Sequence, residues 1–220
     1  MKTLEKTIII LIALSCLCGL CGKEEDPEIT TCTPFYLGRE YKTVQIGDQC
    51  WMAENLDFNA GAGCWEAPDP IEGWGRYYTW EAAKRVCPDG WHIPTKADWE
   101  QMMQYISDQN GGYERKDFEL GAIVWYGPAV HLKTNEEWIA NKGTNDYGFA
   151  AIPAGYRRVE PSTGDVEYAG YNHTGMWWSS SNDGTSARHC FIDHASQEFR
   201  NYATASHLVN NGMTIRYIKD

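Results

Sequence analysis

The chain has few basic residues for its length. Its 220 residues include 19 Lys and Arg against 30 Asp and Glu, which gives a formal net charge of −11. Such an acidic chain repels a nucleic-acid backbone and the anionic headgroups of a membrane. The charge balance therefore argues against nucleic acid as a partner and against membrane binding through a basic patch.

A membrane-spanning stretch is also missing. The apolar run of residues 8–14 is too short, because a transmembrane helix takes about 20 apolar residues. The run follows Lys2 and Lys6, so residues 1–21 have the basic and apolar regions of an export signal. We expect this segment to direct export rather than to join the fold.

Motifs of covalent catalysis are missing as well. Ser179-Ser180-Ser181 lacks the G-x-S-x-G pattern of a nucleophile elbow. Glu136 and Glu137 are neighbours in the sequence, whereas a glycosidase needs two carboxylates that face each other across a cleft. We interpret the two glutamates as part of a solvated surface and expect no enzyme.

Metal-ligand spacing is absent from the cysteines beyond residue 21, since none of them forms a C-x-x-C pair. The densest group of ligand-type residues is the run 189–194. On a strand, His189 and Asp193 lie on one face while Cys190 and His194 lie on the other. We therefore expect a strand followed by a polar turn, and no metal site.

Aromatic residues are abundant instead, with 10 Trp and 13 Tyr, and most are expected to fill the core of an irregular α+β domain. Trp80, Ala83 and Cys87 recur at helical spacing and give a first helix one apolar face. Pro88-Asp89-Gly90 ends this helix, and residues 91–93 are expected to be extended.

A second helix is expected directly after this segment. Thr95 is its N-cap, and Asp98 occupies the capping-box position. Gly111 follows the helix as its stop. Its buried stripe consists of Trp99, Met102, Met103 and Ile106.

The rest of the chain alternates short strand patterns with turn residues. Gly47-Asp48 marks a hairpin turn, and residues 161–165 mark a hairpin tip. Residues 149–157 are expected to form a core strand interrupted by a proline. Glu54 and Asn55 are interpreted as partners of backbone groups rather than of a ligand. Residues 120–125 are expected to be a strand or a buried loop, and further strands are expected at residues 176–179, 187–193, 197–202 and 213–217.

Four blocks of this sequence carry a family resemblance. The central block is Tyr78-x-Trp80-x-x-Ala83-x-x-x-Cys87-Pro88-x-Gly90-Trp91-His92-x-Pro94-x-x-x-x-Trp99. Residues 43–56, residues 143–157, and the pair 177–180 and 212–216 supply the others. Over residues 35–220 the chain resembles the Fibrobacter succinogenes major paralogous domain, a family of secreted and surface lipoprotein modules.

The resemblance implies an α+β fold similar to C-type lectins and to formylglycine-generating enzymes. In that fold two helices pack on short twisted antiparallel strands, and the second half is rich in loops. Residues 35–220 are then a single domain, and the polar, acidic residues 22–34 are a flexible tether.

A lipoprotein module also needs an acylated cysteine. Gly22-Lys23-Glu24-Glu25-Asp26 resembles the surface-export signal of bacterial lipoproteins, so Cys21 is the expected lipidation site, with Cys16 as the alternative. We expect an outer-membrane lipid anchor and a domain that faces the exterior. Plain secretion after an ordinary signal peptide is the other interpretation.

The function that follows is a surface-displayed binding module for an extracellular glycan or protein. Aromatic excess suits stacking on sugar rings, and loops on a rigid scaffold commonly form binding surfaces. One alternative is a structural or adhesion component of the cell envelope without a small ligand. The other is a degenerate enzyme of the formylglycine-generating type, although only one of the two expected redox cysteines, Cys190, lies in the second half.

Ligand-binding candidates are the aromatic and polar residues of loop-like segments. Trp65 and Trp74 lie in a long loop of the first half. The resemblance places the ligand face on the second-half loop and so favours that loop over Trp65. The residues expected to form this surface are Glu160, Tyr168, Tyr171 and Asn172, with Asn182 and Asp183 closing it.

Calcium is the one cofactor considered, because sugar-binding C-type lectins use it with a Glu-Pro-Asn loop. Here the loop reads Glu160-Pro161-Ser162, and Asn182-Asp183 is displaced from its usual place after a Trp. A surface turn explains these residues equally well, so no cofactor is predicted.

Five cysteines follow the export signal, and the odd number leaves at least one without a partner in the chain. Cys50 and Cys64 are the expected disulfide, because the loop between them is short. The resemblance implies that Cys87 would bond a cysteine of the last strand, where this chain has Tyr217. Cys87 with Cys190 is a weaker alternative.

Overall fold

The computed structural model describes residues 29–117, 122–203 and 208–220. These residues form an α+β fold with three helices and several small antiparallel sheets, as the sequence predicts. The export signal with Cys16 and Cys21, and the first residues of the predicted tether, lie outside the described residues. Within the described ranges, no helix has the length and apolar character needed to cross a membrane.

The first half of the chain alternates short strands with two helices. The Gly47-Asp48 turn joins two paired strands as predicted, and the two predicted helices both form. The elements are β1 (Phe35–Leu37), β2 (Arg39–Tyr41), β3 (Thr43–Ile46), β4 (Gln49–Met52), β5 (Cys64–Trp65), β6 (Tyr77–Tyr78), α1 (Trp80–Arg85), β7 (Trp91–His92) and α2 (Lys96–Asn110).

The elements of the second half are strands apart from helix α3, and loops such as residues 133–155 separate them, as the expected loop-rich second half implies. Most strands lie where the turn pattern predicts them, including the hairpin with its tip at residues 161–165. The elements are β8 (Tyr113–Asp117), β9 (Ala122–Tyr126), α3 (Pro128–Leu132), β10 (Tyr156–Val159), β11 (Val166–Ala169), β12 (Thr174–Ser180), β13 (Ala187–Asp193), β14 (Glu198–Ala203) and β15 (Ile218–Lys219).

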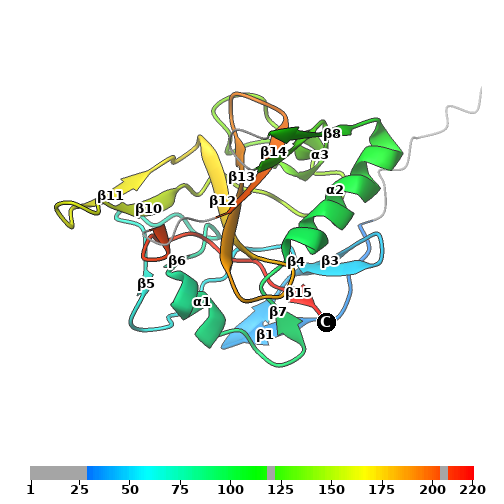
Figure 1. Ribbon diagram of the computed structural model, residues 1–220. Helices are drawn as coiled ribbons and strands as arrows, with labels where there is room; N and C mark the ends of the chain where they lie inside the picture. Colours follow the sequence, from blue (N-terminus) through cyan, green and yellow to red (C-terminus); the bar gives the residue numbers. More distant parts are fainter. Residues whose placement is uncertain (1–28, 118–121, 204–207) are drawn as a thin grey trace, which may run out of the picture.

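Two sheets organise the domain. The larger one has the antiparallel order β12-β13-β14-β9-β8, and the smaller one has the order β3-β4-β15-β7. Strand β15, at the C-terminal end of the chain, therefore lies between β4 and β7. The paired strands β3 and β4 are called the first hairpin below. Figure 1 shows α2 running diagonally on the right, beside the strands of the larger sheet, while the β10–β11 hairpin projects to the left.

The ends of α2 match the sequence prediction residue by residue. The Thr95 hydroxyl accepts the N–H of Asp98, and the Asp98 carboxylate accepts the N–H of Thr95, which is a complete capping box. Gly111 ends the helix in the left-handed conformation with φ 79°. The predicted stripe of Trp99, Met102, Met103 and Ile106 is fully buried.

Three points of local structure differ from the prediction. The strand expected at residues 213–217 is not formed: Met213 and Thr214 make only isolated bridges, and the last strand is β15. Helix α3 was not predicted, because its five residues are too few to show a helical period, although Pro128 occupies a favoured first-turn position. The expected core strand at residues 149–157 is strand only from Tyr156 onward. Pro153 has no N–H to donate, and the carbonyl groups of Phe149 and Ala150 bond a side chain instead of a strand.

That side chain is Arg216, which is buried. Its guanidinium donates to the carbonyl oxygens of Phe149 and Ala150, and its Nε donates to Asn55 Oδ1 at 2.8 Å. Asn55 Oδ1 also accepts the indole N–H of Trp177 at 2.9 Å. One buried network thus connects the blocks around residues 55, 150, 177 and 216, far apart in sequence.

The Gly-Trp-His block also has a structural role. The His92 ring lies between the carboxylates of Asp220 and Asp98, with Nδ1 2.7 Å from Asp220 Oδ1 and Nε2 3.1 Å from Asp98 Oδ2. Asp98 is the capping-box residue of α2, and Asp220 directly follows β15. His92 therefore joins the start of α2 to the C-terminal strand.

This arrangement predicts a pH-dependent contribution to stability. The hydrogen bond to Asp98, with a further one to Asp220, raises the pKa of His92, and the pKa of Asp98 is lowered although burial opposes it. A histidine whose pKa is raised by folding stabilises the folded state. This contribution is fully present below the pKa of histidine in the unfolded chain, about 6.5, and it is lost as the pH rises through the pKa in the folded protein. The difference in unfolding free energy between wild type and His92→Gln should be larger at pH 6 than at pH 9. The change in this difference should be less than about 1 kcal/mol, because the ion pair is partly solvated.

Urea denaturation at the two pH values measures this difference. An equal stability difference at pH 6 and pH 9 for His92→Gln would contradict a charged His92.

Candidate functional site

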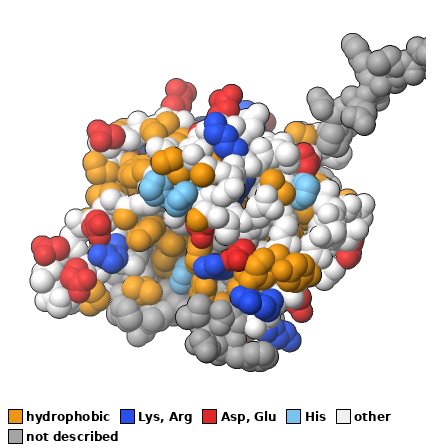
Figure 2. Space-filling model, turned by 90° about the horizontal axis from the view of Figure 1, so that it is seen from above, with side chains coloured by type: hydrophobic (Ala, Val, Ile, Leu, Met, Phe, Trp, Pro, Cys, Tyr) orange, Lys and Arg blue, Asp and Glu red, His pale blue; other side chains and the backbone are white. Residues whose placement is uncertain are grey.

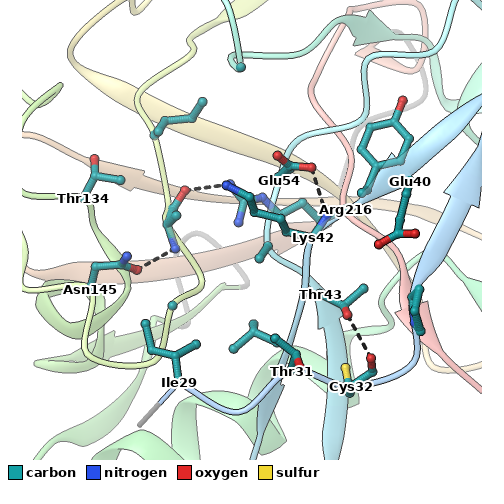
Figure 3. Close-up of a pocket in the computed structure, with 18 of the residues that line it drawn as sticks. Ile29, Thr31, Cys32, Glu40, Lys42, Thr43, Glu54, Thr134, Asn145 and Arg216 are labelled. Atoms are coloured by element: carbon teal, nitrogen blue, oxygen red, sulfur yellow. Dashed lines mark hydrogen bonds between the residues drawn. The ribbon is translucent and has the colours of Figure 1, made fainter. Parts of the chain in front are cut away.

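One hollow of the described surface is a cavity of about 600 Å³ beside the first hairpin. Residues 29–34 and 40–44 form one side, and residues 134–152 contribute the other. Figure 3 shows Thr134 and Asn145 opposite Thr31 and Thr43, with Glu54 and Arg216 between the two sides. The buried network around Arg216 therefore reaches the surface at this cavity.

A disulfide fixes one wall of the cavity and corrects the predicted pairing. Cys50 is bonded to Cys32, with Cα atoms 5.8 Å apart, while Cys64 is a free thiol. The short loop between Cys50 and Cys64 was not decisive, because Cys64 lies in β5 opposite Tyr78 of β6. Cys50 instead lies in β4, beside the segment that enters the domain at residue 30.

The same segment corrects the predicted extent of the tether. The N–H of Gln45 donates to the Thr30 carbonyl at 2.8 Å, and the Thr43 hydroxyl donates to the Cys32 carbonyl at 3.3 Å. Ile29 packs so closely against Gly148 that a Cβ there would lie 2.6 Å from its side chain. Residues 29–34 are thus bonded to and packed against the domain.

Charged groups at the floor of the cavity are already bonded to the protein. Burial lowers the pKa of Arg216 to about 9, and its N–H groups are held as described above. Glu54 Oε2 accepts the N–H of Lys42 at 3.0 Å and a guanidinium N–H of Arg39 at 3.2 Å. Asn55 Nδ2 donates to the Trp74 carbonyl at 3.0 Å. The interpretation of Glu54 and Asn55 as partners of backbone groups is confirmed.

Glu137 differs from the other polar residues of the lining. Its Oε2 is buried and has no hydrogen-bond partner among the described residues. By contrast, Asn145 Oδ1 accepts the N–H of Ala150 at 2.6 Å, and the Thr134 hydroxyl donates to the Ala151 carbonyl at 3.3 Å. A buried carboxylate oxygen without a donor is costly, so Glu137 has unmet hydrogen-bonding capacity beside the cavity.

Sequence reasoning missed this residue. The pair Glu136-Glu137 was interpreted as a solvated surface, which fits Glu136, whereas Glu137 is only partly exposed. Its partner segments, residues 29–34 and 40–44, are about a hundred positions away in sequence. No local pattern in the sequence indicates that these segments lie near Glu137.

The ligand-binding residues predicted from the sequence do not form one cluster. Tyr171 and Asn172 precede β12, whereas Asn182 and Asp183 follow it. The seven residues of β12 span about 20 Å at the usual rise of a strand. Glu160 lies at the far end of the β10–β11 hairpin, so three separate places hold the predicted residues.

The aromatic candidates are mostly packed against each other. The Tyr171 ring is stacked on that of Trp74, with centroids 6.0 Å apart, and Trp74 is 8% exposed. The Tyr168 ring lies 5.7 Å from that of Tyr77. Burial raises the pKa of Tyr77 and Tyr171, whose hydroxyl groups are neighbours. The Trp65 ring is covered by the Arg157 guanidinium, 3.8 Å from the ring centroid.

The polar candidates stabilise turns. Asn182 Oδ1 accepts the N–H of Ala97 in the first turn of α2 at 3.0 Å. Asp183 accepts hydrogen bonds from Ser181 and Thr185, which lowers its pKa to about 2. Glu160 Oε1 accepts the hydroxyl of Ser162 at 3.0 Å. Asn172 is a left-handed turn residue with φ 59°, and its N–H donates to the Pro153 carbonyl.

In the parts of the chain that the structure describes, no three His, Cys, Asp or Glu side chains come together as ligands for a metal ion. The calcium-motif residues Glu160 and Asp183 lie in separate turns. Residues 187–193 form strand β13 as predicted, so the ligand-type residues there point to both faces. Cys190 is buried in the core, where its thiol donates to the Trp177 carbonyl and burial raises its pKa.

Comparison with known protein families gives one match. The family model of the Fibrobacter succinogenes major domain matches residues 44–219, and the chain belongs to this family. No curated protein and no solved structure matches the chain.

Proposed function

We propose that the chain is a lipid-anchored, surface-displayed module that binds an extracellular glycan or protein through the cavity beside the first hairpin. The observation that carries this proposal is the buried, unbonded Oε2 of Glu137 in the cavity lining. The cavity volume, about 600 Å³, lies within the range of about 300–1,000 Å³ that is common for ligand pockets.

Of the two ligand classes, the chemistry of the lining favours a glycan. Sugar hydroxyl groups donate to carboxylates and accept from cations. Glu137 and Glu40 offer carboxylates and Lys42 offers an ammonium group, while Ile29 and Ile152 offer apolar contact to the C–H faces of a sugar ring. Lining groups of both signs suit a neutral, polyhydroxylated ligand better than a strongly charged one.

The C-type-lectin-like architecture implied by the family resemblance is part of this proposal. One feature supports it: helices α1 and α2 lie beside short antiparallel strands. The proposed cavity differs from the second-half loop that the resemblance favours. The ligand face in this chain is then built from the first hairpin and the loops after α3.

An enzyme of the formylglycine-generating type is the weaker candidate. Such chemistry uses reactive thiols, and reactive thiols have a lowered pKa and solvent access. Burial instead raises the pKa of Cys190, and it raises that of Cys87 to about 12. No observation on these side chains favours catalysis over binding.

Membrane attachment rests on Cys21, which lies outside the described residues. Cys21→Ser is expected to release the protein from the membrane fraction in cell fractionation, whereas Cys16→Ser retains it there. Membrane retention of Cys21→Ser would contradict the assigned anchor.

Binding is tested by a glycan array probed with the full chain, followed by titration of the glycans that bind. Glu137→Gln removes the carboxylate charge at nearly constant volume and is expected to weaken binding about tenfold or more, as for loss of one charge-assisted hydrogen bond. Its melting temperature should not fall, because Glu137 has no protein partner for that oxygen.

Two further variants locate the ligand face. Glu114→Gln changes an exposed glutamate of β8, away from the cavity lining, and should bind as wild type does. Tyr168→Ala tests the surface expected from the resemblance. Loss of binding in Tyr168→Ala with full binding in Glu137→Gln would move the ligand face to the β10–β11 hairpin and contradict the cavity.

A further inference from the structure

Two histidines of the second half form a close pair at one end of the larger sheet. Thr174 of β12 lies opposite Asp193 of β13, so His173 and His194 are the next residues outward on the two strands. The N–H of His194 donates to the His173 carbonyl at 2.7 Å. The two ring centroids are 4.5 Å apart and the ring planes differ by 34°.

The backbone around the pair is fixed by hydrogen bonds. The N–H of His173 donates to the Gly170 carbonyl at 3.0 Å, and Asn141 Nδ2 donates to the His194 carbonyl at 2.8 Å. The backbone positions of the two histidines are therefore set by the fold. Histidine side chains reach the surface of the molecule in the view of Figure 2.

A ring nitrogen of the pair has no hydrogen-bond partner. Nδ1 of His194 is buried and unbonded among the described residues. The nearby Asp193 does not supply a partner through its Oδ1, which accepts the N–H groups of Ala195 and Ser196 at 2.8 and 2.9 Å. An imidazole nitrogen with an unshared electron pair is a common ligand for zinc, copper and nickel ions.

The ring separation indicates which coordination geometry the pair fits. A metal–nitrogen distance of about 2.1 Å, plus about 1.1 Å from nitrogen to ring centre, puts each centroid about 3.2 Å from the ion. When the nitrogen–metal–nitrogen angle is 90°, the two ring centroids lie about 4.5 Å apart. A tetrahedral nitrogen–metal–nitrogen angle places them about 5.2 Å apart. The observed 4.5 Å matches neighbouring positions of a square-planar or octahedral ion.

We propose that His173 and His194 form a two-histidine site for a divalent transition-metal ion, with Cu²⁺ and Ni²⁺ preferred over Zn²⁺. Cu²⁺ and Ni²⁺ favour square-planar or tetragonal coordination, in which neighbouring ligands lie at about 90°. Zn²⁺ favours tetrahedral coordination, which the pair fits less well. No third His, Cys, Asp or Glu side chain of the described residues completes a cluster, so water fills the other positions. The bound ion would join the loop before β12 to the turn after β13.

The site is independent of the proposed cavity, and its test does not require a glycan. The full chain, purified without a polyhistidine tag, is titrated with Ni²⁺ and with Cu²⁺ by calorimetry at pH 7.5. One equivalent of either ion should bind, and the same titration at pH 5 should show at least tenfold weaker binding, because only the neutral imidazole is a ligand.

Variants assign the binding to the pair. His173→Ala and His194→Ala should each weaken Ni²⁺ binding at least tenfold, and electron paramagnetic resonance of the Cu²⁺ complex should show two coupled nitrogens that fall to one in either variant. His131→Ala retains the pair and should bind as wild type does. His173 is exposed, so its variant stays folded and keeps the test decisive. Equal binding by wild type and His173→Ala, or no binding by wild type, would overturn the proposal.

Discussion

A guanidinium buried at the centre of the domain is the constraint on which the other parts depend. Removing the Arg216 charge from water is costly unless every N–H group finds an acceptor. Asn55 Oδ1 and the carbonyl oxygens of Phe149 and Ala150 supply those acceptors, and the guanidinium carbon lies 4.3 Å from the Phe149 ring centroid. Because the acceptors come from separate segments, the segments must meet for the charge to be tolerated. The family blocks around residues 55, 150 and 216 are thus partners in one network.

Local features of the fold could be predicted from the sequence, since their causes lie within a few residues. The cap at Thr95 and Asp98, the stop at Gly111 and the β10–β11 hairpin all formed as expected. Features set by distant partners could not. The backbone at Phe149 bonds Arg216 rather than a strand, and Cys50 bonds Cys32 because of where β4 lies, not because of loop length.

The candidate site follows the same division. Aromatic residues of loop-like sequence, such as Trp74 and Tyr171, were expected to face a ligand, yet they stack on each other. A loop-like sequence pattern does not reveal that two loops cover one another. The unbonded oxygen of Glu137 and the pairing of His173 with His194 depend on contacts between distant segments. The positions of these side chains depend on the tertiary network, so no local sequence pattern indicates them.

A double-mutant cycle on Asn55 and Arg216 tests this account most directly. The free energies of unfolding of Asn55→Ala, Arg216→Met and the double variant are measured by urea denaturation. Asn55→Ala alone should cost about 3–5 kcal/mol, because it leaves a buried charge short of an acceptor. In the double variant that charge is gone, so the account predicts a total cost below the sum of the single costs by about 2 kcal/mol or more. Additive costs would contradict the central role of the buried network.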